Sequence, residues 1–169
     1  NFWDERYRSA DRVWSGRVNA TLVSEAAGLT PGRALDIGAG EGADAIWLAE
    51  RGWNVVAVDI SSVALERGRR QAEVVGVADR ITWVHSDVLA DGLPAGSFDL
   101  VSSHYTHLAS ADRTALFSHC FDAVAPGGTV LIVAHHPSDL DTPIRRPPRP
   151  ELFYTAEEIA AQVGEEFTV

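Results

Sequence analysis

The 169-residue sequence contains no lysine, no methionine and a single cysteine. All 14 basic side chains are arginines. This excludes a phosphate-binding P-loop, whose motif requires lysine, and catalysis through a lysine Schiff base. The thiol of Cys120 can form no disulfide within the chain and cannot supply a cysteine-based zinc site alone. We expect Cys120 to be a small buried group, in a protein of the reducing cytoplasm.

Long apolar runs and an excess of positive charge are also missing. No stretch is long and apolar enough to span a membrane, and no signal peptide is visible. The net charge is −10, whereas nucleic-acid binding depends on basic side chains that neutralise phosphates. The composition therefore disfavours a nucleic acid or an anionic membrane surface as a partner. Hydrophobic residues make up 46% of the chain, which predicts a single folded domain over residues 1–169.

Apolar strand patterns alternate with helical patterns along the chain. We expect strands at 33–39, 54–60, 81–86, 98–103 and 129–134, and helices at 43–51, 63–75 and 111–125, the last capped by Ser110. The alternation predicts a Rossmann-like α/β fold, that is, a doubly wound, mostly parallel sheet with helices on both faces. Residues 33–135 form the expected core, and residues 1–30 are expected to be helical with interleaved aromatics.

The C-terminal part is less regular in its pattern. Prolines in residues 137–150 disfavour a helix or a central strand there and predict a loop beside the site. Thr155-Ala156-Glu157-Glu158 is typical of a capping box that begins a last helix. A sixth strand is expected to begin at Phe167, just before the sequence stops, so the last strand pair of the sheet is expected to be incomplete.

A glycine-rich turn follows the first expected strand, in the sequence DIGAGEG from Asp36 to Gly42. Such glycines let the backbone pass close to a ligand, with N–H groups and a helix N-terminus pointing at it. Gly38, Gly40 and Ala43 fit the GxGxx[GA] pattern of dinucleotide-binding proteins. Asp36 and the three glycines also fit DxGxGxG, the pattern of S-adenosylmethionine (SAM) sites. The glycines alone leave both cofactors open.

Acidic residues at the strand ends help to separate the two cofactors. Asp36 lies inside the first strand, where a carboxylate would repel a pyrophosphate and attract the ammonium and sulfonium groups of SAM. Asp59 ends the second strand and can accept both ribose hydroxyls, which either cofactor would require. Asp87 ends the third strand and can accept from an adenine amino group, while the N–H of Val88 donates to the ring. This third position favours SAM.

Taken in order, these motifs resemble those of class I SAM-dependent methyltransferases over about residues 33–135. The resemblance lies in the DxGxGxG turn, Asp59, Ser86-Asp87, Ser97-Phe98-Asp99-Leu100-Val101 and Ala125-Pro126-Gly127-Gly128. The sequences FWDERY from Phe2 and VWSG from Val13 resemble a small bacterial branch similar to tellurite-resistance and thiopurine methyltransferases. In that branch the N-terminal segment closes over the cofactor, which implies a lid formed by residues 1–30.

The resemblance implies transfer of a methyl group from SAM to a small-molecule acceptor by in-line displacement, leaving S-adenosylhomocysteine. A general base is needed only for a hydroxyl or amine nucleophile, and His104, Tyr105 and His136 are the candidates. Adjacent His135 and His136 would point opposite ways on an extended chain, so no metal site is expected. The expected cofactor-binding residues are Trp14, Asp36, Gly38, Ala39, Gly40, Gly42, Asp59, Ile60, Ser86, Asp87, Val88, Ser103 and His104.

Two other functions stay open at this point. An NAD-dependent dehydrogenase would fit the glycines and Asp59, but it does not explain Asp36. A non-catalytic SAM-binding module would bind SAM without turning over any acceptor. Arg145, Arg146 and Arg149 could recognise an acidic substrate, although arginines in a proline-rich loop are more typical of a solvated surface.

Overall fold

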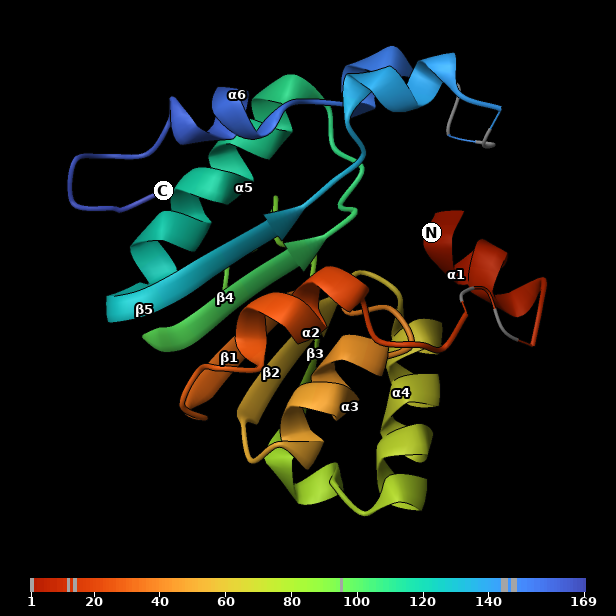
Figure 1. Ribbon diagram of the computed structural model, residues 1–169. Helices are drawn as coiled ribbons and strands as arrows, with labels where there is room; N and C mark the ends of the chain where they lie inside the picture. Colours follow the sequence, from red (N-terminus) through yellow and green to blue (C-terminus); the bar gives the residue numbers. More distant parts are fainter. Residues whose placement is uncertain (1, 12, 14, 95, 144–145, 147–148) are drawn as a thin grey trace.

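A single parallel sheet organises the protein (Figure 1). The computed structural model describes residues 2–11, 13, 15–94, 96–143, 146 and 149–169. Within them, five strands lie in the order β3-β2-β1-β4-β5, and all four pairings are parallel. The strands are β1 Arg33–Ile37, β2 Asn54–Asp59, β3 Ile81–His85, β4 Phe98–His104 and β5 Val124–Val133. The predicted Rossmann-like α/β fold is therefore confirmed.

Helices cover both faces of this sheet (Figure 1). One face carries α2 (Ala20–Ala26), α3 (Ala43–Glu50) and α4 (Ser62–Val75), and the other carries α5 (Ser110–Ala123) and α6 (Ala156–Ala160). Successive strand residues point to opposite faces, so β2 contributes to both cores. Val55 and Ala57 pack under α3, whereas Val58 packs in the core that holds Cys120 of α5. Cys120 is fully buried, as the sequence predicts.

Local side-chain chemistry explains where the helices begin. Ser61 caps α4, because its hydroxyl accepts a hydrogen bond from the N–H of Ala64 at 3.2 Å. The predicted capping box of α6 is confirmed, with Thr155 and Glu158 bonding to each other's backbone. The predicted cap of α5 is wrong. Ser110 is already the first helical residue, and Ala109 occupies the cap position without a side-chain bond.

Some predicted boundaries also differ. β1 ends at Ile37, two residues early, because Gly38 has a φ of 71° and turns the chain away from the strand direction. β5 begins five residues early, at Val124, with a register shift against β4 between Phe98 and Leu100. The strand expected at Phe167 does not form. The ring of Phe167 packs instead against that of Phe121 on α5, with centroids 5.4 Å apart.

The N-terminal helix and the loops complete the fold. Helix α1 (Phe2–Arg8) packs against α4, where the carboxylate of Asp4 accepts from the hydroxyl of Ser61 at 2.7 Å. In the described parts of the loops there are three short 3-10 helices, η1 (Ala78–Arg80), η2 (Pro137–Asp141) and η3 (Pro150–Leu152). The last two lie in or at the end of the proline-rich stretch. Among the residues that the structure describes, no helix combines the length and apolar character needed to cross a membrane.

Candidate functional site

A cavity of about 730 Å³ lies at the edge of the sheet where the parallel strands end. In open α/β sheets, ligands bind in the crevice outside the carboxyl ends of the strands, and this volume suits a nucleotide-sized ligand. The structure places most of the predicted site residues around this cavity. They are Gly38, Ala39, Gly40, Gly42, Asp59, Ile60, Ser86, Asp87, Val88, His104 and Tyr105.

The glycine turn between β1 and α3 forms one wall of the cavity. Gly38, Gly40 and Gly42 have φ angles of 71°, 55° and 81°, which only glycine adopts without strain. The N–H groups of Gly38 and Ala39 both donate to the carbonyl of Val58, at 2.9 and 3.0 Å, so the turn is fixed to the end of β2. A Cβ atom at Gly42 would overlap the ring of Trp83. The packing therefore leaves the turn no room for a side chain at Gly42.

Asp59 connects the end of β2 to this turn. Its Oδ2 accepts from the N–H of Gly40 and its Oδ1 from the N–H of Ser61, both at 2.8 Å. Burial raises the pKa of Asp59, and the two N–H groups oppose that rise. Each carboxylate oxygen can accept more than one hydrogen bond, so both keep acceptor capacity for ligand hydroxyls.

The turn after β3 is also held by carboxylates. Asp91 accepts at its Oδ2 from the hydroxyl of Ser86 and from the N–H of Asp87, at 3.0 and 3.1 Å. The carboxylate of Asp87 accepts from the N–H of Leu89 at 3.1 Å. This network places Asp87 and Val88 against the cavity.

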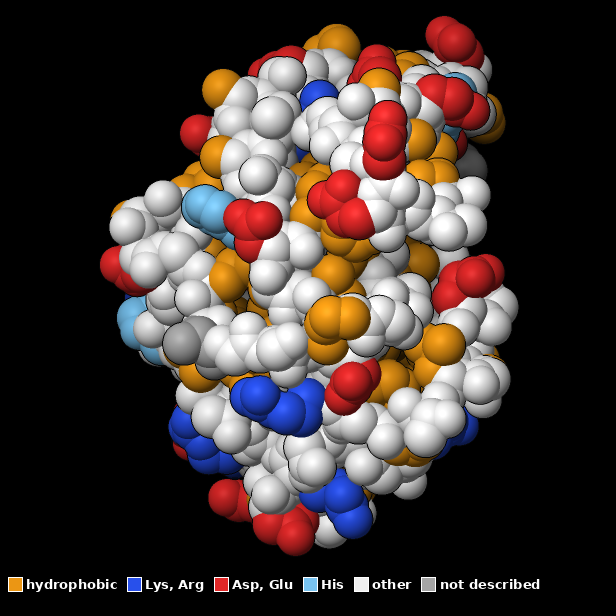
Figure 2. All heavy atoms as spheres, turned by 90° about the vertical axis from the view of Figure 1, so that its left-hand side faces the viewer, with side chains coloured by type: hydrophobic (Ala, Val, Ile, Leu, Met, Phe, Trp, Pro, Cys, Tyr) orange, Lys and Arg blue, Asp and Glu red, His pale blue; other side chains and the backbone are white. Residues whose placement is uncertain are grey.

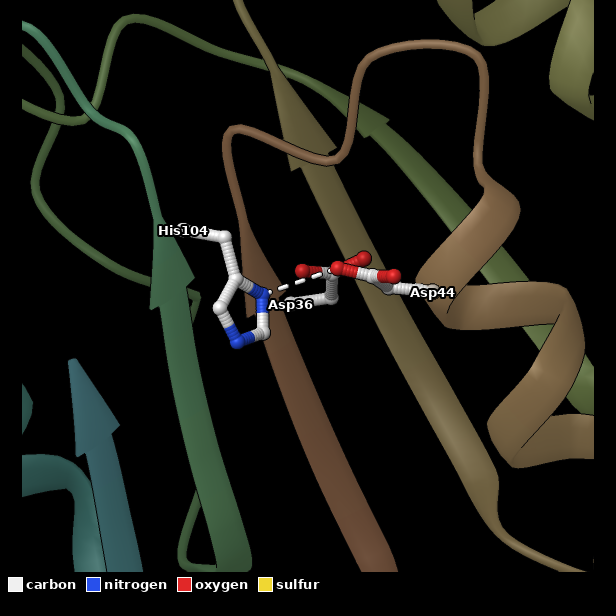
Figure 3. A group of neighbouring side chains, drawn as sticks. All are labelled: Asp36, Asp44 and His104. Carbon is white, nitrogen blue, oxygen red and sulfur yellow. Dashed lines mark ion pairs between the residues drawn. The ribbon is translucent and has the colours of Figure 1, made fainter. Parts of the chain in front are cut away.

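Asp36, Asp44 and His104 converge from β1, α3 and β4 (Figure 3). The Nδ1 of His104 lies 2.9 Å from the Oδ2 of Asp44, and the ligand atoms of all three lie within 4.8 Å of one another. Asp36 is 2% exposed, and its Oδ2 has no hydrogen-bond partner among the described residues. Burial raises the pKa of Asp36 to about 7, with a further rise from Asp44 and an opposing effect from His104. Such a group could hold a cation, and a proton on Asp36 meets the same electrostatic need.

This cluster changes the predicted role of Asp36. Asp44 and His104 line the cavity, but Asp36 does not. In place of Asp36, the carboxylate of Asp44 in the first turn of α3 faces the cavity. Its Oδ1 accepts from the N–H of Asn19 at 2.7 Å, which fixes its direction. The sequence offered one sign of this role, because Asp44 is an acid in the first turn of the helix that follows the glycine turn.

The predicted catalytic role of His104 is also revised. Its Nδ1 faces Asp44, and its Nε2 is buried without a hydrogen-bond partner in the described part of the chain. Neither nitrogen is free to reach an acceptor in the cavity. Ser103, which was predicted to bind the cofactor, does not line the cavity, and its hydroxyl contacts that of Thr106.

His136 lies outside this cavity. It lines a second one, of about 1000 Å³, beside β5 and α6. Its Nδ1 accepts from the N–H of Ser138 and so caps η2. His136 thus follows the carboxyl end of β5, as expected, but it does not line the cavity that holds the other predicted site residues. Figure 2 shows the side of the molecule on which the strands begin, with hydrophobic side chains in its hollows.

Trp14, another predicted cofactor residue, lies outside the described residues.

Rings from the segments after β4 and β5 line the remaining part of the cavity. The ring centroids of Tyr105 and His135 are 4.6 Å apart, and those of His107 and His135 are 5.8 Å apart. Tyr105 is the one described non-glycine residue with a left-handed backbone, with a φ of 53°. Such strain is concentrated at functional sites. His135 and Arg146, both in this wall, also contact Asp139.

Comparison with known proteins identifies relatives of the chain. Residues 34–128 match the sequence family described as methyltransferase domain. The tRNA 5-carboxymethoxyuridine methyltransferase of Escherichia coli is 31% identical over 106 residues, which is 62% of this chain and 40% of that protein. The chain spans less than two thirds of the length of curated relatives such as this one.

Solved structures of other proteins share the fold, and two serve as examples. One comes from work on "Conversion of a Disulfide Bond into a Thioacetal Group during Echinomycin Biosynthesis" and has a TM-score of 0.77 and 24% identity. It matches over 97% of this chain and 76% of that chain. TehB from Haemophilus influenzae has a TM-score of 0.65 and 19% identity, over 79% of this chain and 45% of that chain.

Proposed function

The chain belongs to the class I SAM-dependent methyltransferases, and we propose that it transfers a methyl group from SAM to a small-molecule acceptor. One observation supports this above all. The glycine turn, Asp59 and Asp87 lie at the carboxyl ends of three different strands and line the same cavity. We assign Asp59 to the ribose hydroxyls, Asp87 and Val88 to the adenine, and the glycine turn to the methionine part of SAM.

The charges around the cavity favour SAM over NAD. Glu41, Asp44, Asp59 and Asp87 all line it. A dinucleotide would have to place its pyrophosphate at the N-terminus of α3, next to the carboxylate of Asp44. SAM instead carries an ammonium and a sulfonium, which carboxylates attract. We assign Asp44 to the ammonium group.

The protein contributes alignment rather than covalent chemistry. Bound SAM supplies an electrophilic methyl group and a thioether that leaves without needing a proton. The residues of the cavity hold the acceptor in line with that methyl group and exclude water. Removal of a proton from the acceptor is the one chemical step that would fall to a side chain.

We propose that residues 1–30 form the lid of the site. Trp3 and Tyr7 of α1 line the cavity. Arg67 of α4 donates to the carbonyls of Tyr7 and Ala10, at 2.7 and 2.8 Å, and to the carboxylate of Glu41 in the glycine turn, at 2.9 Å. One side chain thus ties the N-terminal segment to the loop that would contact the cofactor.

Charge also supports a small acceptor over a nucleic acid. The net charge is −10, and arginines on the face in Figure 2 are interspersed with acidic side chains. Nucleic-acid binding would instead favour a basic stripe. Arg146, which lines the cavity, is already neutralised by Asp139.

Calorimetric titration with SAM, S-adenosylhomocysteine and NADH tests this proposal. We expect micromolar binding of the first two and no binding of NADH. Release of S-adenosylhomocysteine with an acceptor then separates an enzyme from a SAM-binding module. Binding of NADH alone would overturn the proposal, because the assignments of Asp44 and Asp87 would then fail.

A further inference from the structure

We propose that His135 is the general base of the reaction and that the acceptor is a phenol-type hydroxyl whose proton His135 removes. This inference rests on the proposed methyl transfer. His135 lies two residues after the carboxyl end of β5 and lines the cavity. Its Nδ1 lies 3.3 Å from the Oδ2 of Asp139, so Nε2 is the ring nitrogen left to take a proton.

Asp139 is suited to orient this ring. It lies in η2, four residues after His135, and its Oδ2 also contacts the Nε of Arg146 at 2.9 Å. A carboxylate beside Nδ1–H fixes the tautomer of a histidine and stabilises the imidazolium that forms when Nε2 takes a proton. Asp139 is therefore a positioning residue that acts through His135.

The surroundings keep His135 unprotonated and thus able to act as a base. Burial lowers its pKa, Arg146 lowers it further, and Asp139 opposes both effects. The ionisable groups that face the ring from the segment after β4 are Tyr105 and His107. Burial lowers the pKa of His107 as well, and His135 adds to that effect.

The other candidates lack one part of this arrangement. His104 has its Nε2 buried, and His136 lies in the second cavity. His107 lines the cavity and stacks on His135, but no carboxylate forms an ion pair with it among the described residues. Among the described histidines, His104 and His135 both line the cavity with a carboxylate on Nδ1, but only His104 has its Nε2 buried without a partner. His135 is therefore the better candidate for the base.

The wall around His135 determines the class of acceptor. His107 stacks on its ring, and the rings of Tyr105 and Phe153 lie tilted to it, with centroids 4.6 and 6.0 Å away. Flat faces of this kind favour a planar aromatic acceptor. A phenol loses its proton near pH 10, so at neutral pH it needs a base, whereas an aromatic thiol does not.

The atoms balance in this step. The acceptor oxygen forms the new C–O bond as the C–S bond breaks, and the sulfur keeps the electron pair of that bond. The hydroxyl proton passes to Nε2 of His135 and is later released to solvent. No oxidant or further reactant is needed.

Histidine NMR of the free protein tests the base directly, and His135→Gln identifies the signal among the six histidines. At neutral pH we expect Nδ1 of His135 to carry the proton and Nε2 to be bare. Asp139→Asn should lower the titration midpoint by about one unit, because it removes the carboxylate that favours the charged ring. A proton on Nε2, or a midpoint unmoved by Asp139→Asn, would overturn the proposal.

Turnover provides the second test, with catechol and thiophenol as acceptors and S-adenosylhomocysteine as the measured product. His135→Gln should lower kcat for catechol about 100-fold or more and leave thiophenol within a few fold. The control is His119→Gln, at an exposed position of α5, which should change neither rate. Asp139→Asn should lower kcat for catechol and shift its pH profile.

The outcomes separate this inference from the proposed function. If the wild-type protein fails to bind SAM in calorimetry, the proposed function itself is wrong. If it binds SAM but methylates neither acceptor, the aromatic acceptor class is wrong. If catechol is methylated equally well by His135→Gln, the base assignment alone is wrong.

Discussion

Replacement of Asp36 by asparagine should remove a pH-dependent loss of stability. Asp36 is fully buried beside Asp44 and His104, and its pKa is raised from 3.8 to about 7. Between these two values the folded protein keeps a proton that the unfolded chain releases. The free energy of unfolding therefore falls as the pH rises through this window, and the loss is complete above about pH 7.

The size of the effect follows from the shift. One pKa unit corresponds to about 1.4 kcal/mol, so the shift of Asp36 amounts to up to about 4 kcal/mol. Asparagine carries no charge at any pH and has nearly the same shape. The stability of Asp36→Asn relative to wild type should therefore rise by up to about 4 kcal/mol between about pH 4 and about pH 8.

Urea unfolding across this pH range measures the difference. Asp122→Asn, the same change at an exposed position of α5, is the control and should follow the wild-type curve. Asp44→Asn should flatten the wild-type fall in part, because Asp44 contributes to the raised pKa of Asp36. Parallel curves for wild type and Asp36→Asn would refute the reasoning, since Asp36 would then be ionised in the folded protein at low pH.

Three further variants test the site and its frame. Asp59→Ala should weaken SAM about 100-fold in calorimetry, through lost ribose contacts and a loosened turn, and unchanged affinity would contradict the ribose assignment. Arg67→Lys keeps the charge but offers one nitrogen where Arg67 uses two, Nη1 for Glu41 and Nη2 for Tyr7 and Ala10, so SAM should bind about tenfold more weakly. Equal affinity would argue against the lid. Thr155→Ala should lower the urea-measured stability by about 1 kcal/mol and leave SAM binding unchanged, because α6 lies away from the cavity. A stable variant that binds SAM poorly would contradict that separation.

The sheet was predictable because local patterns and global packing agree. Apolar strand segments such as Asn54–Asp59 match the buried parallel ladder in which β2 lies, between β1 and β3. The glycine turn was predictable because its left-handed φ angles require glycine. The start of β5 was missed because Pro126-Gly127-Gly128 indicates a turn, whereas pairing of Val124 with Phe98 extends the strand over it.

The cofactor side of the site was more predictable than the acceptor side. Asp59 ends β2 and Asp87 lies just after β3, and the parallel sheet alone brings such positions to one edge. Which histidine faces the cavity depends on side-chain packing. Alternation along the chain shows that His135 and His136 point opposite ways, but only the packing of Tyr105 and Phe153 decides which one faces the cavity.

The site still favours SAM over a dinucleotide although Asp36 does not face the cavity. A carboxylate near the N-terminus of α3 favours SAM, and the sequence indicated Asp36, the acid inside β1. The structure gives the role to Asp44, held by the N–H of Asn19 and by His104. Behind it, Asp36 with a pKa of about 7 can take up or release a proton when the charge in front changes. A cation arriving at Asp44 would lower the pKa of Asp36, whereas a pyrophosphate would raise it. The pair of carboxylates thus favours a positively charged ligand more strongly than either would alone.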